Sequence, residues 1–406
     1  MTENAPLEDI VILEGARTPM AEYIGTPGFG KLAPLSALDL GSLATKEALK
    51  RAKVAPEEID HVVIGNVMQT SADAIYGARH VALKAQIPFR VPALTLNRLC
   101  GSGIQAVVTG AQLIQLKEAT TCIVGGTENM SQAPHIIRGA REGFSLGQGE
   151  LEDSLMKALF DPVCQLFMAQ TAENLAKKHQ ITREEQDAYA LRSQQSASKA
   201  LRAGLFKEEI FSVEVQKGKK SVLVDTDDHF RPDTTLEGLS KLRAAFGKEG
   251  TVTAGNASGI VDGAAVLVIT SASNAEQKQR KPLARIRGWA VVGVEPELMG
   301  IGPVPAIQAL LKKTGLSLSQ IDRFEINEAF AAQYLGVERE LGNSREKTNV
   351  LGGAIALGHP LGATGTRLIL TLCYQLRREG LKYGIASACI GGGQGIAILI
   401  ENLSSR

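Results

Sequence analysis

The sequence predicts an α/β protein in which layers of helices lie over a sheet. Short β-branched runs at 62–67, 93–96 and 121–124 alternate with helical stretches at 74–84 and 103–117. Glycine is abundant, with 42 residues, whereas aromatic residues make up only 4% of the chain. The 406 residues are enough for two or three domains, each with its own core.

An internal repeat indicates that the α/β unit occurs twice. The pair Ile59-Asp60 recurs as Ile321-Asp322, at an offset of 262 residues. The same offset aligns Ser102 with Thr364, and each of these residues opens a predicted helix. Because one ungapped register connects separate segments, we expect two copies of one α/β unit.

The repeat divides the chain into three predicted parts. The first copy spans about 1–130 and the second about 275–406, with a region of different character at 131–274. This middle region contains long polar helices, and a stretch of well over a hundred residues needs its own packing. We therefore expect an inserted loop domain at 131–274, which also carries part of the last strands of the first copy.

The composition excludes several classes of protein. Lys and Arg total 44 against 43 Asp and Glu, so the basic excess of a nucleic-acid binder is missing. No apolar run approaches the roughly 20 residues that cross a bilayer. The five cysteines are scattered without CxxC spacing, which argues against a disulfide framework and against zinc. The start of the chain lacks a secretory pattern, so we expect a cytoplasmic protein with reduced thiols.

Cys100 is the first candidate nucleophile. It lies in the segment NRLCGSG (97–103), after a predicted strand and before a predicted helix. The start of a helix favours a thiolate through its dipole and its unpaired N–H groups. By composition alone, a buried structural cysteine is equally plausible, but the small neighbours leave room for a substrate carbonyl.

His359 is the second candidate functional residue. It lies in GGAIALGHPLGATG (352–365), where glycine and alanine give its ring little cover. The other five histidines lie in sequences typical of surface helices and loops. A lone histidine is usually structural, but this context favours a ring that faces a cavity.

Two further segments end predicted strands with chemically useful residues. Cys389 lies in SACIGGGQG (387–395), where a strand follows the glycines. A dinucleotide-binding loop would instead open a helix, so we reject that interpretation. The N–H groups at 391–393 are suited to an oxyanion. Asn327 and Glu328 follow another strand, where a helix cap is the ordinary role of Asn327.

Together, the segments CGSG (100–103), NEAF (327–330), GHPLG (358–362) and CIGGGQG (389–395) resemble the thiolase family, with a likeness that runs from Asp9 to Ile400. The resemblance implies the thiolase fold, in which two duplicated βαβαβαββ halves form layers in the order α-β-α-β-α, with an inserted loop domain. It implies reversible CoA-dependent cleavage of 3-ketoacyl-CoA to acetyl-CoA and a shortened acyl-CoA. The reverse reaction condenses two acetyl-CoA to acetoacetyl-CoA.

The resemblance also implies a role for each site residue. Cys100 takes the acyl group as a thioester, His359 activates Cys100, and Cys389 moves the α-proton of acetyl-CoA. Asn327 holds a water for one oxyanion hole, in which His359 is the other donor. The N–H groups of Cys100 and Gly391 form a second hole. This chemistry needs no metal and no cofactor, because coenzyme A is a substrate.

In the same way, the middle region resembles the CoA-binding loop domain of the family. Arg231, in HFRP (229–232), matches the arginine that meets the nucleotide end of CoA. Ser258, in NASG (256–259), matches the serine that bonds the pantetheine arm. Met168 and Phe330 would line the tunnel. Since the family forms dimers that often pair, we expect a homotetramer that binds CoA, acetyl-CoA and 3-ketoacyl-CoA.

Some segments point to a group within the family. The segments MGIGPVP (299–305) and AIALGH (354–359) are most similar to mitochondrial-type 3-ketoacyl-CoA thiolases. Acetoacetyl-specific members typically carry His-Met-Gly where this chain has FMA (167–169), and Gly238 replaces a serine that often contacts CoA. We therefore expect a broader acyl range that includes acetoacetyl-CoA.

Two alternative functions are compatible with the duplicated fold. A decarboxylating condensing enzyme of the ketoacyl synthase type shares the duplicated fold but usually needs one cysteine and two histidines, and no second histidine lies in a comparable loop. A catalytically silent lipid carrier or scaffold of the same fold would have lost the nucleophile or the histidine. Cys100, His359 and Cys389 are all present, which favours a thiolase.

Overall fold

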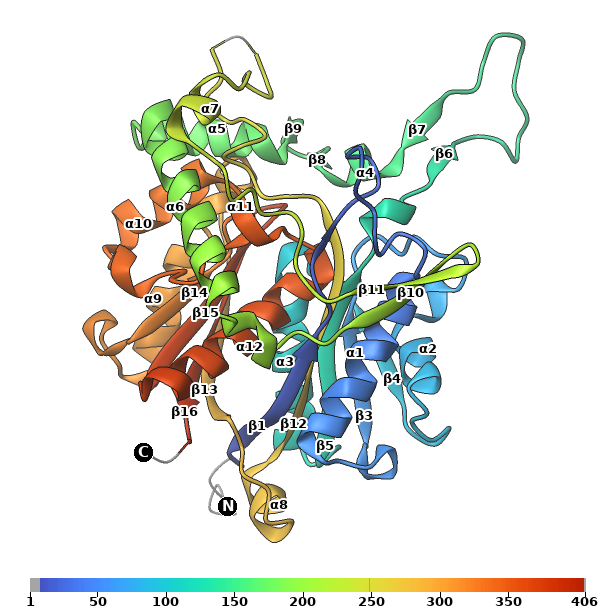
Figure 1. Ribbon diagram of the computed structural model, residues 1–406, viewed down its shortest axis with the longest axis vertical. Coiled ribbons are helices and arrows are strands. Elements are labelled where there is room, and N and C mark those ends of the chain that lie inside the picture. Colours follow the sequence, from blue (N-terminus) through green and yellow to red (C-terminus); the bar gives the residue numbers. More distant parts are fainter. Residues whose placement is uncertain (1–7, 248, 405–406) are drawn as a thin grey trace, which may run out of the picture.

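The central feature of the fold is one long mixed sheet. The computed structural model describes residues 8–247 and 249–404, so the acidic start at 1–7 lies outside the described residues. The strands follow the order β14-β15-β16-β13-β1-β12-β5-β3-β4, and β2 (Ala21–Glu22) pairs with β12 (Figure 1). The strands of this order are β1 (Ile10–Arg17), β3 (His61–Gly65), β4 (Ala93–Leu96), β5 (Thr121–Glu128), β12 (Val261–Ser271), β13 (Ala284–Gly293), β14 (Arg323–Ile326), β15 (Tyr383–Ile390) and β16 (Gln394–Asn402).

Two similar groups of strands meet in the middle of this sheet. In the first half β3 runs parallel to β4 and β5, and in the second half β14 runs parallel to β15. Antiparallel pairing of Ile10 with Ile286 joins β1 to β13 and so connects the halves. The remaining pairs, including β12 with β5 and β16 with β15, are antiparallel.

Helices form three layers around the two groups of strands. Helices α3 and α12 pack against each other and against strands of both halves, so they form the middle layer. Helices α1 and α2 cover the first half on its outer side, and α9 covers the second half (Figure 1). The resulting order of layers, α-β-α-β-α, is the predicted one. The helices are α1 (Ala37–Ala52), α2 (Gly77–Lys84), α3 (Ser102–Gln115), α8 (Ala272–Gln277), α9 (Pro303–Thr314), α10 (Ala331–Leu341), α11 (Ala354–Leu357) and α12 (Leu361–Glu379).

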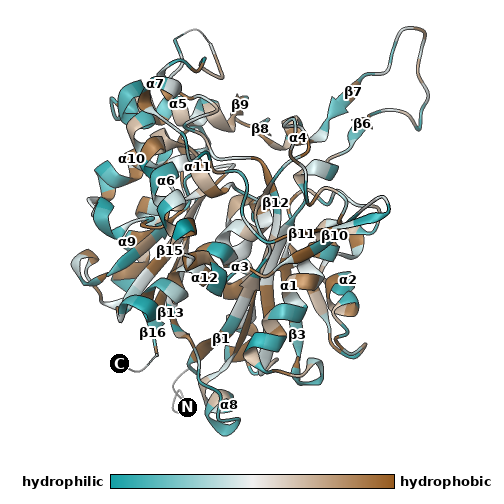
Figure 2. Cartoon of the chain, in the orientation of Figure 1, coloured by the Kyte–Doolittle hydropathy of each residue, from teal (hydrophilic) through white to brown (hydrophobic). Residues whose placement is uncertain are grey.

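The middle helices bury apolar side chains against strands that carry brown, apolar stretches in Figure 2. Ile104 and Val107 of α3 and Leu368 and Leu372 of α12 are fully buried in one cluster. Burying a side chain of this size stabilises the fold by roughly 1.5–3 kcal/mol. The two halves therefore share a core, and the loops at the ends of α3 and α12 lie at the contact between them.

The structure confirms the predicted repeat. Strand β5 at 121–128 and strand β15 at 383–390 have the same length and the offset of 262 residues. Asp60 accepts hydrogen bonds from the N–H groups of Thr120 and Thr121, at 2.9 and 3.0 Å. Asp322 accepts the equivalent bonds from Lys382 and Tyr383, both at 2.9 Å. The two halves therefore have the same pair of side-chain to backbone hydrogen bonds at equivalent positions.

The region between the halves is built from helices and short hairpins. Thr182 caps α6 with Glu185 in the predicted capping box. The β6–β7 hairpin extends far from the rest of the chain (Figure 1), and none of the described helices is both long and apolar enough to cross a membrane. The elements of this region are β6 (His135–Ile137), β7 (Leu151–Asp153), α4 (Ser154–Ala158), β8 (Phe160–Asp161), β9 (Leu166–Phe167), α5 (Met168–Lys178), α6 (Arg183–Arg202), β10 (Val213–Lys217), β11 (Lys220–Val224) and α7 (Leu236–Ser240).

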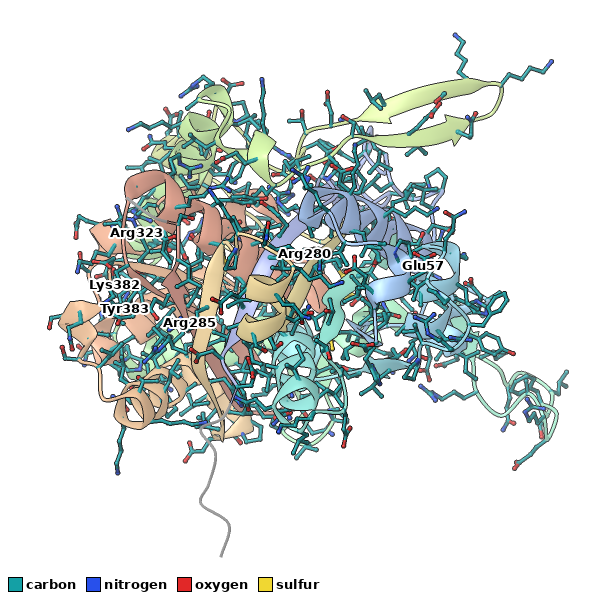
Figure 3. All side chains as sticks on the ribbon, turned by 90° about the horizontal axis from the view of Figure 1, so that it is seen from below. Glu57, Arg280, Arg285, Arg323, Lys382 and Tyr383 are labelled. Carbon is teal, nitrogen blue, oxygen red and sulfur yellow. The ribbon has the colours of Figure 1, made fainter. Side chains whose placement is uncertain are left out.

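The direction of the parallel strands decides where the site lies. Arg323 begins β14 and Tyr383 begins β15. Both residues lie on the lower face of the molecule, which Figure 3 shows. The opposite ends of these strands carry Asn327 and Cys389. Ligands of parallel α/β sheets usually bind at the carboxyl ends of the strands, so the candidate residues lie where such a site is expected.

Candidate active site

Cys100 lies in a strained turn between β4 and α3. Leu99, the residue before it, has a left-handed backbone conformation with φ of 45°. The hydroxyl of Ser102 stabilises this turn, because it donates to the carbonyl of Leu99 at 2.7 Å and accepts from the N–H of Arg98 at 2.8 Å. Strain of this kind is typical of functional sites. The turn holds the sulfur against the second half of the molecule.

The surroundings of Cys100 favour its neutral form. Burial raises the pKa of the Cys100 thiol to about 11, and the charge of Glu128 acts in the same direction. Hydrogen bonds from the backbone N–H groups of Gly391 and of Cys100 itself favour the thiolate but do not outweigh burial. The N–H groups at the helix start therefore favour the thiolate, as the sequence predicts, but they do not ionise the thiol by themselves.

His359 is nearly completely buried and held on both ring nitrogens. Its Nδ1 lies 2.6 Å from the hydroxyl oxygen of Thr364, and its Nε2 lies 3.3 Å from Nδ2 of Asn327. The Thr364 hydroxyl donates its own proton to the carbonyl of Pro360, at 3.0 Å. It must therefore accept a proton from Nδ1, which assigns the basic lone pair to Nε2.

His359 is uncharged in the folded protein, although its lowered pKa makes it a weak base. Burial and the positive charge of Arg367 lower the pKa of His359 to about 3. The ring is consequently neutral near pH 7, and its Nε2 atom can accept a proton.

Asn327 follows β14 and is completely buried. Its backbone N–H donates to the carbonyl of Ser387 at 2.9 Å, which ties it to β15. Its Nδ2 faces His359, while its Oδ1 is buried without a hydrogen-bond partner among the described residues. A buried polar atom of this kind is expected to bind a water or a ligand.

Cys389 is the second thiol of the site. It is completely buried near the end of β15, in a cluster with Met299, Ala329 and Phe330. Burial raises the pKa of Cys389 far above its ordinary value, and the neighbouring Cys100 raises this pKa further. The two sulfurs are thus close enough to influence each other, and both are protonated in the resting site.

The structure brings the predicted residues together from both halves. The turn at 99–101 packs against Ile390 and Gly391, and a Cβ at Gly391 would lie 3.1 Å from the sulfur of Met168. His359, Met168, Ser258 and Phe330 line one cavity of about 290 Å³. Most of its other lining is apolar, from Met130, Met156, Leu159, Phe167 and Leu361. The cavity therefore suits an apolar chain beside polar, reactive groups.

Arg231 lies in a different cleft, which has a volume of about 530 Å³ and also contains His229 and Gly238. Its guanidinium stacks over the ring of Phe29 at 4.7 Å and pairs with Glu22. Although burial opposes ionisation, hydrogen bonds from His229, Thr26 and Arg231 lower the pKa of Glu22 to about 2. Arg231 is thus fixed in place but does not touch the catalytic cluster.

Two residues of the site were not identified from the sequence. In the sequence, Thr364 stands out only as the equivalent of Ser102 in the repeat. That equivalence is itself a signal that the two hydroxyls have similar roles. Each hydroxyl follows a candidate residue and bonds to the carbonyl of the turn that carries it. Glu128 gave no signal, because an acidic residue at the end of a strand is ordinary and its hydrogen-bond partners are distant in sequence.

The fold and the site define an enzyme of duplicated α/β architecture with two buried thiols and a buried histidine at the contact between its halves. Comparison with known proteins is more specific. Residues 10–273 match the N-terminal domain of thiolase and residues 280–402 match its C-terminal domain. The chain belongs to the thiolase family.

Similar proteins come from animals and from bacteria. The human mitochondrial 3-ketoacyl-CoA thiolase is 53% identical over 98% of this chain and 99% of its own. Its crystal structure matches with a TM-score of 0.95 and covers 98% of this chain and 100% of that chain. The crystal structure of the Bacillus anthracis acetyl-CoA acetyltransferase is 44% identical, with a TM-score of 0.96, and covers 99% and 100% of the two chains. A further structure of the human enzyme contains CoA.

The prediction of a cytoplasmic location is contradicted by these relatives. The human, orangutan, bovine, mouse and rat proteins at 50–53% identity are all mitochondrial enzymes. The physical reason for the error is that a missing secretory pattern does not distinguish the cytoplasm from an organelle.

Proposed function

We propose that the protein is a thiolase that cleaves 3-ketoacyl-CoA with CoA and, in reverse, condenses two acetyl-CoA to acetoacetyl-CoA. The observation that carries this proposal is the placement of both thiols beside the apolar cavity that His359 lines. Cys100 packs in one cluster with Leu361, and Cys389 packs in another with Met168 and Phe330, and these three apolar residues line the cavity. The names of the relatives, 3-ketoacyl-CoA thiolase and acetyl-CoA acetyltransferase, support both directions of the reaction.

In the cleavage direction His359 Nε2 takes the proton of the Cys100 thiol. The thiolate attacks the 3-keto carbonyl, and a carbon–sulfur bond forms. The bond between C2 and C3 then breaks, and its electron pair leaves as the enolate of acetyl-CoA. Cys389 protonates that enolate. The high pKa of Cys389 supports this role, because the thiol holds its proton until a carbon base appears.

The second half of the cycle restores both cysteines. The thiol of CoA gives its proton to the Cys389 thiolate, and its sulfur attacks the acyl-Cys100 thioester. Cys100 leaves as a thiolate and recovers its proton from His359. One acyl-CoA is released, and no redox change occurs. Thioester exchange is nearly balanced in energy, so the direction follows the supply of substrates.

Two oxyanion holes would serve the two stages. The N–H groups of Cys100 and Gly391 already point at the Cys100 sulfur, which supports their role toward the oxygen of a bound acyl group. The buried Oδ1 of Asn327 supports its role in holding a water beside His359. Donors placed in this way lower a barrier by roughly 3–4 kcal/mol each.

We further propose that CoA extends from the cavity toward Arg231. Ser258, Met168 and Phe330 line the cavity, so they would contact the pantetheine arm. Arg231 would meet the nucleotide end, since Glu22 and Phe29 hold its guanidinium at the surface. Gly238 lines the same cleft as Arg231, which fits its position in the family as a residue near CoA.

The apolar lining supports an acyl range broader than acetoacetyl-CoA. Met130, Met156, Leu159 and Leu361 surround the cavity with flexible or branched apolar side chains. Such side chains tolerate chains of different length. We therefore propose activity on 3-ketoacyl-CoA substrates longer than acetoacetyl-CoA.

We also propose that the protein forms a homotetramer. Strand β4 ends the sheet, and Ile75, Tyr76, Phe89 and Leu94 beside or on it expose large apolar side chains. The β6–β7 hairpin exposes Phe144, Leu146 and Leu151 far from the core. Apolar surface and an open strand edge usually mark contacts between subunits. Two separate surfaces suit a dimer of dimers.

The experiment that tests the function is thiolysis of a panel of 3-ketoacyl-CoA substrates by the purified protein. Loss of the thioester enolate absorbance in the presence of CoA is expected for acetoacetyl-CoA and for longer substrates. Cys100→Ala serves as the blank. An enzyme that cleaves none of these substrates, or a blank that keeps full activity, would refute the proposal.

A further inference from the structure

Glu128 is a buried carboxylate that accepts four N–H hydrogen bonds and pairs with no cation among the described residues. Its Oε1 accepts from Nδ2 of Asn66 at 3.0 Å and from the N–H of Met68 at 3.1 Å. Its Oε2 accepts from the N–H groups of Val67 at 3.1 Å and of Gly362 at 2.9 Å. The side chain is completely buried. Taking a carboxyl group out of water costs free energy. A completely buried carboxyl group therefore points to a structural or functional role.

The donors come from both halves of the molecule. Asn66, Val67 and Met68 follow β3 in the first half, and Val67 and Met68 pack in the same apolar cluster as Cys100. Gly362 belongs to the first turn of α12 in the second half, where the helix dipole favours a negative charge. One carboxylate therefore connects the surroundings of the nucleophile with the start of α12.

The backbones approach closely at this contact. A Cβ at Gly362 would lie 2.8 Å from the carbonyl oxygens of Gly65 and Thr127. A Cβ at Gly126 would clash with the carbonyl of Gly362. Only glycine fits at these positions. Side chains then fix how the backbones meet, through the bond from Gly362 to Glu128 and the bond from the Thr366 hydroxyl to the carbonyl of Gly103.

Gly362 lies three residues after His359 in the segment 353–362. The other end of this segment is held by Glu328, whose Oε2 accepts from the N–H of Ile355 at 3.2 Å and from the hydroxyl of Ser193 at 2.7 Å. Buried carboxylates thus hold both ends of the segment that carries the base. Glu328 receives its bonds from the second half and the middle region, whereas Glu128 alone reaches across to the Cys100 side.

We propose that Glu128 is a positioning residue that holds the His359 segment in register with Cys100. The proposal rests on the proposed function, in which His359 takes the proton of Cys100. Proton transfer between two side chains needs heavy-atom distances within about 3.2 Å. A shift of the α12 start relative to the first half would lengthen that distance without touching the substrate.

Burial raises the pKa of Glu128 to about 7, while the N–H groups of Met68, Gly362 and Val67 favour its ionised form. The ionised form can accept all four bonds, whereas an amide places an NH2 donor at one of the two positions, where it faces two of the N–H groups. Glu128→Gln therefore keeps the shape of the side chain and removes at least two of its four hydrogen bonds.

The test compares Glu128→Gln with a matched control at the other end of the same strand. Asp60 also accepts two backbone N–H bonds with one carboxyl oxygen, from Thr120 and Thr121 at the start of β5, so Asp60→Asn is the control. Hydrogen exchange of peptides covering 353–364 is measured together with kcat and KM. We expect faster exchange in this segment for Glu128→Gln, a fall in kcat of about tenfold or more, and a KM for CoA within about twofold.

Asp60→Asn should change neither the exchange of 353–364 nor kcat. A variant with both Glu128→Gln and His359→Ala should be no slower than His359→Ala alone, because Glu128 acts through the histidine. Unchanged exchange in Glu128→Gln, a kcat within about twofold of the parent, or a further loss in the double variant would overturn the proposal.

A second variant and a readout that is independent of activity complete the test. If Glu128→Gln does not fold, Asn66→Ala removes one donor and keeps the carboxylate, and it should still speed exchange in 353–364; no change there would overturn the proposal. Exchange does not depend on turnover. Faster exchange in a protein without thiolase activity would refute the proposed function and retain the positioning role, whereas unchanged exchange in an active enzyme would refute the positioning role alone.

Discussion

The hydroxyl of Thr364 accepts the Nδ1 proton of His359 over 2.6 Å and donates its own proton to the carbonyl of Pro360 over 3.0 Å. This arrangement fixes both the ring orientation and the tautomer of a histidine that burial keeps neutral. It explains how a base can be available at Nε2 although the side chain has almost no contact with water.

Removing the hydroxyl of Thr364 should leave the His359 ring without its hydrogen bond at Nδ1. Thr364→Val keeps the shape of the side chain but cannot accept the Nδ1 proton, so the wrong tautomer becomes accessible. We expect kcat for acetoacetyl-CoA thiolysis to fall by about 10- to 100-fold, with little change in KM. Thr364→Ser, which keeps the hydroxyl, should retain most of the activity. Equal losses in both variants would show that only packing matters at this position.

The lowered pKa of His359 predicts how stability depends on pH. Between about pH 3 and pH 6.5 the unfolded chain binds a proton at this residue that the folded chain does not bind. The contribution of this group is therefore present above pH 6.5 and is lost as the pH falls. Its loss between pH 6.5 and pH 5 is about 2 kcal/mol of unfolding free energy.

Urea unfolding of His359→Gln at both pH values measures this contribution. Since glutamine does not titrate, the variant should lose about 2 kcal/mol less than the parent on acidification to pH 5. Parallel losses in the two proteins would mean that His359 is not held neutral in the folded state.

Cys389→Ala should separate the two half-reactions. The variant keeps Cys100, His359 and the cavity, so it should still accept an acetyl group from acetyl-CoA. It lacks the acid that exchanges the α-proton, and exchange of deuterium into acetyl-CoA should fall by about 100-fold or more. NMR of the methyl group follows this exchange. An unchanged exchange rate would remove Cys389 from the mechanism.

Arg231→Ala should weaken the binding only of those substrates that carry the nucleotide. We expect KM for CoA to rise by about tenfold, which corresponds to about 1.4 kcal/mol, while kcat changes little. The thiolysis of acetoacetyl-CoA by pantetheine, which lacks the nucleotide, provides the control. If KM for pantetheine rises equally, Arg231 supports the cavity itself rather than the distant end of CoA.

The sequence predicted those features that depend on local pattern or on the repeat. Strand and helix alternation, the offset of 262 residues and the capping box at Thr182 all reappear in the structure. Cys100, His359 and Cys389 were identified because each lies among glycines at the end of a predicted strand or the start of a helix. These signals are local, and parallel strands bring their ends to one edge.

Other features depend on contacts between distant segments and gave no local signal. Glu128 meets Gly362 only because the halves close on each other, and the left-handed conformation of Leu99 is imposed by its surroundings. The balance between burial and N–H donors at Cys100 requires knowledge of what covers the sulfur. The location of the protein was predicted wrongly, since that property is not encoded in the fold.

The central claim is that Cys100, and not Cys389, carries the acyl group. Incubation with acetyl-CoA, acid quench, proteolysis and mass spectrometry measure it directly. The acetyl group should be found on the peptide that contains Cys100, both in the parent enzyme and in Cys389→Ala, and it should be missing from Cys100→Ala. An acetyl group on Cys389, or a labelled Cys100→Ala, would contradict the account.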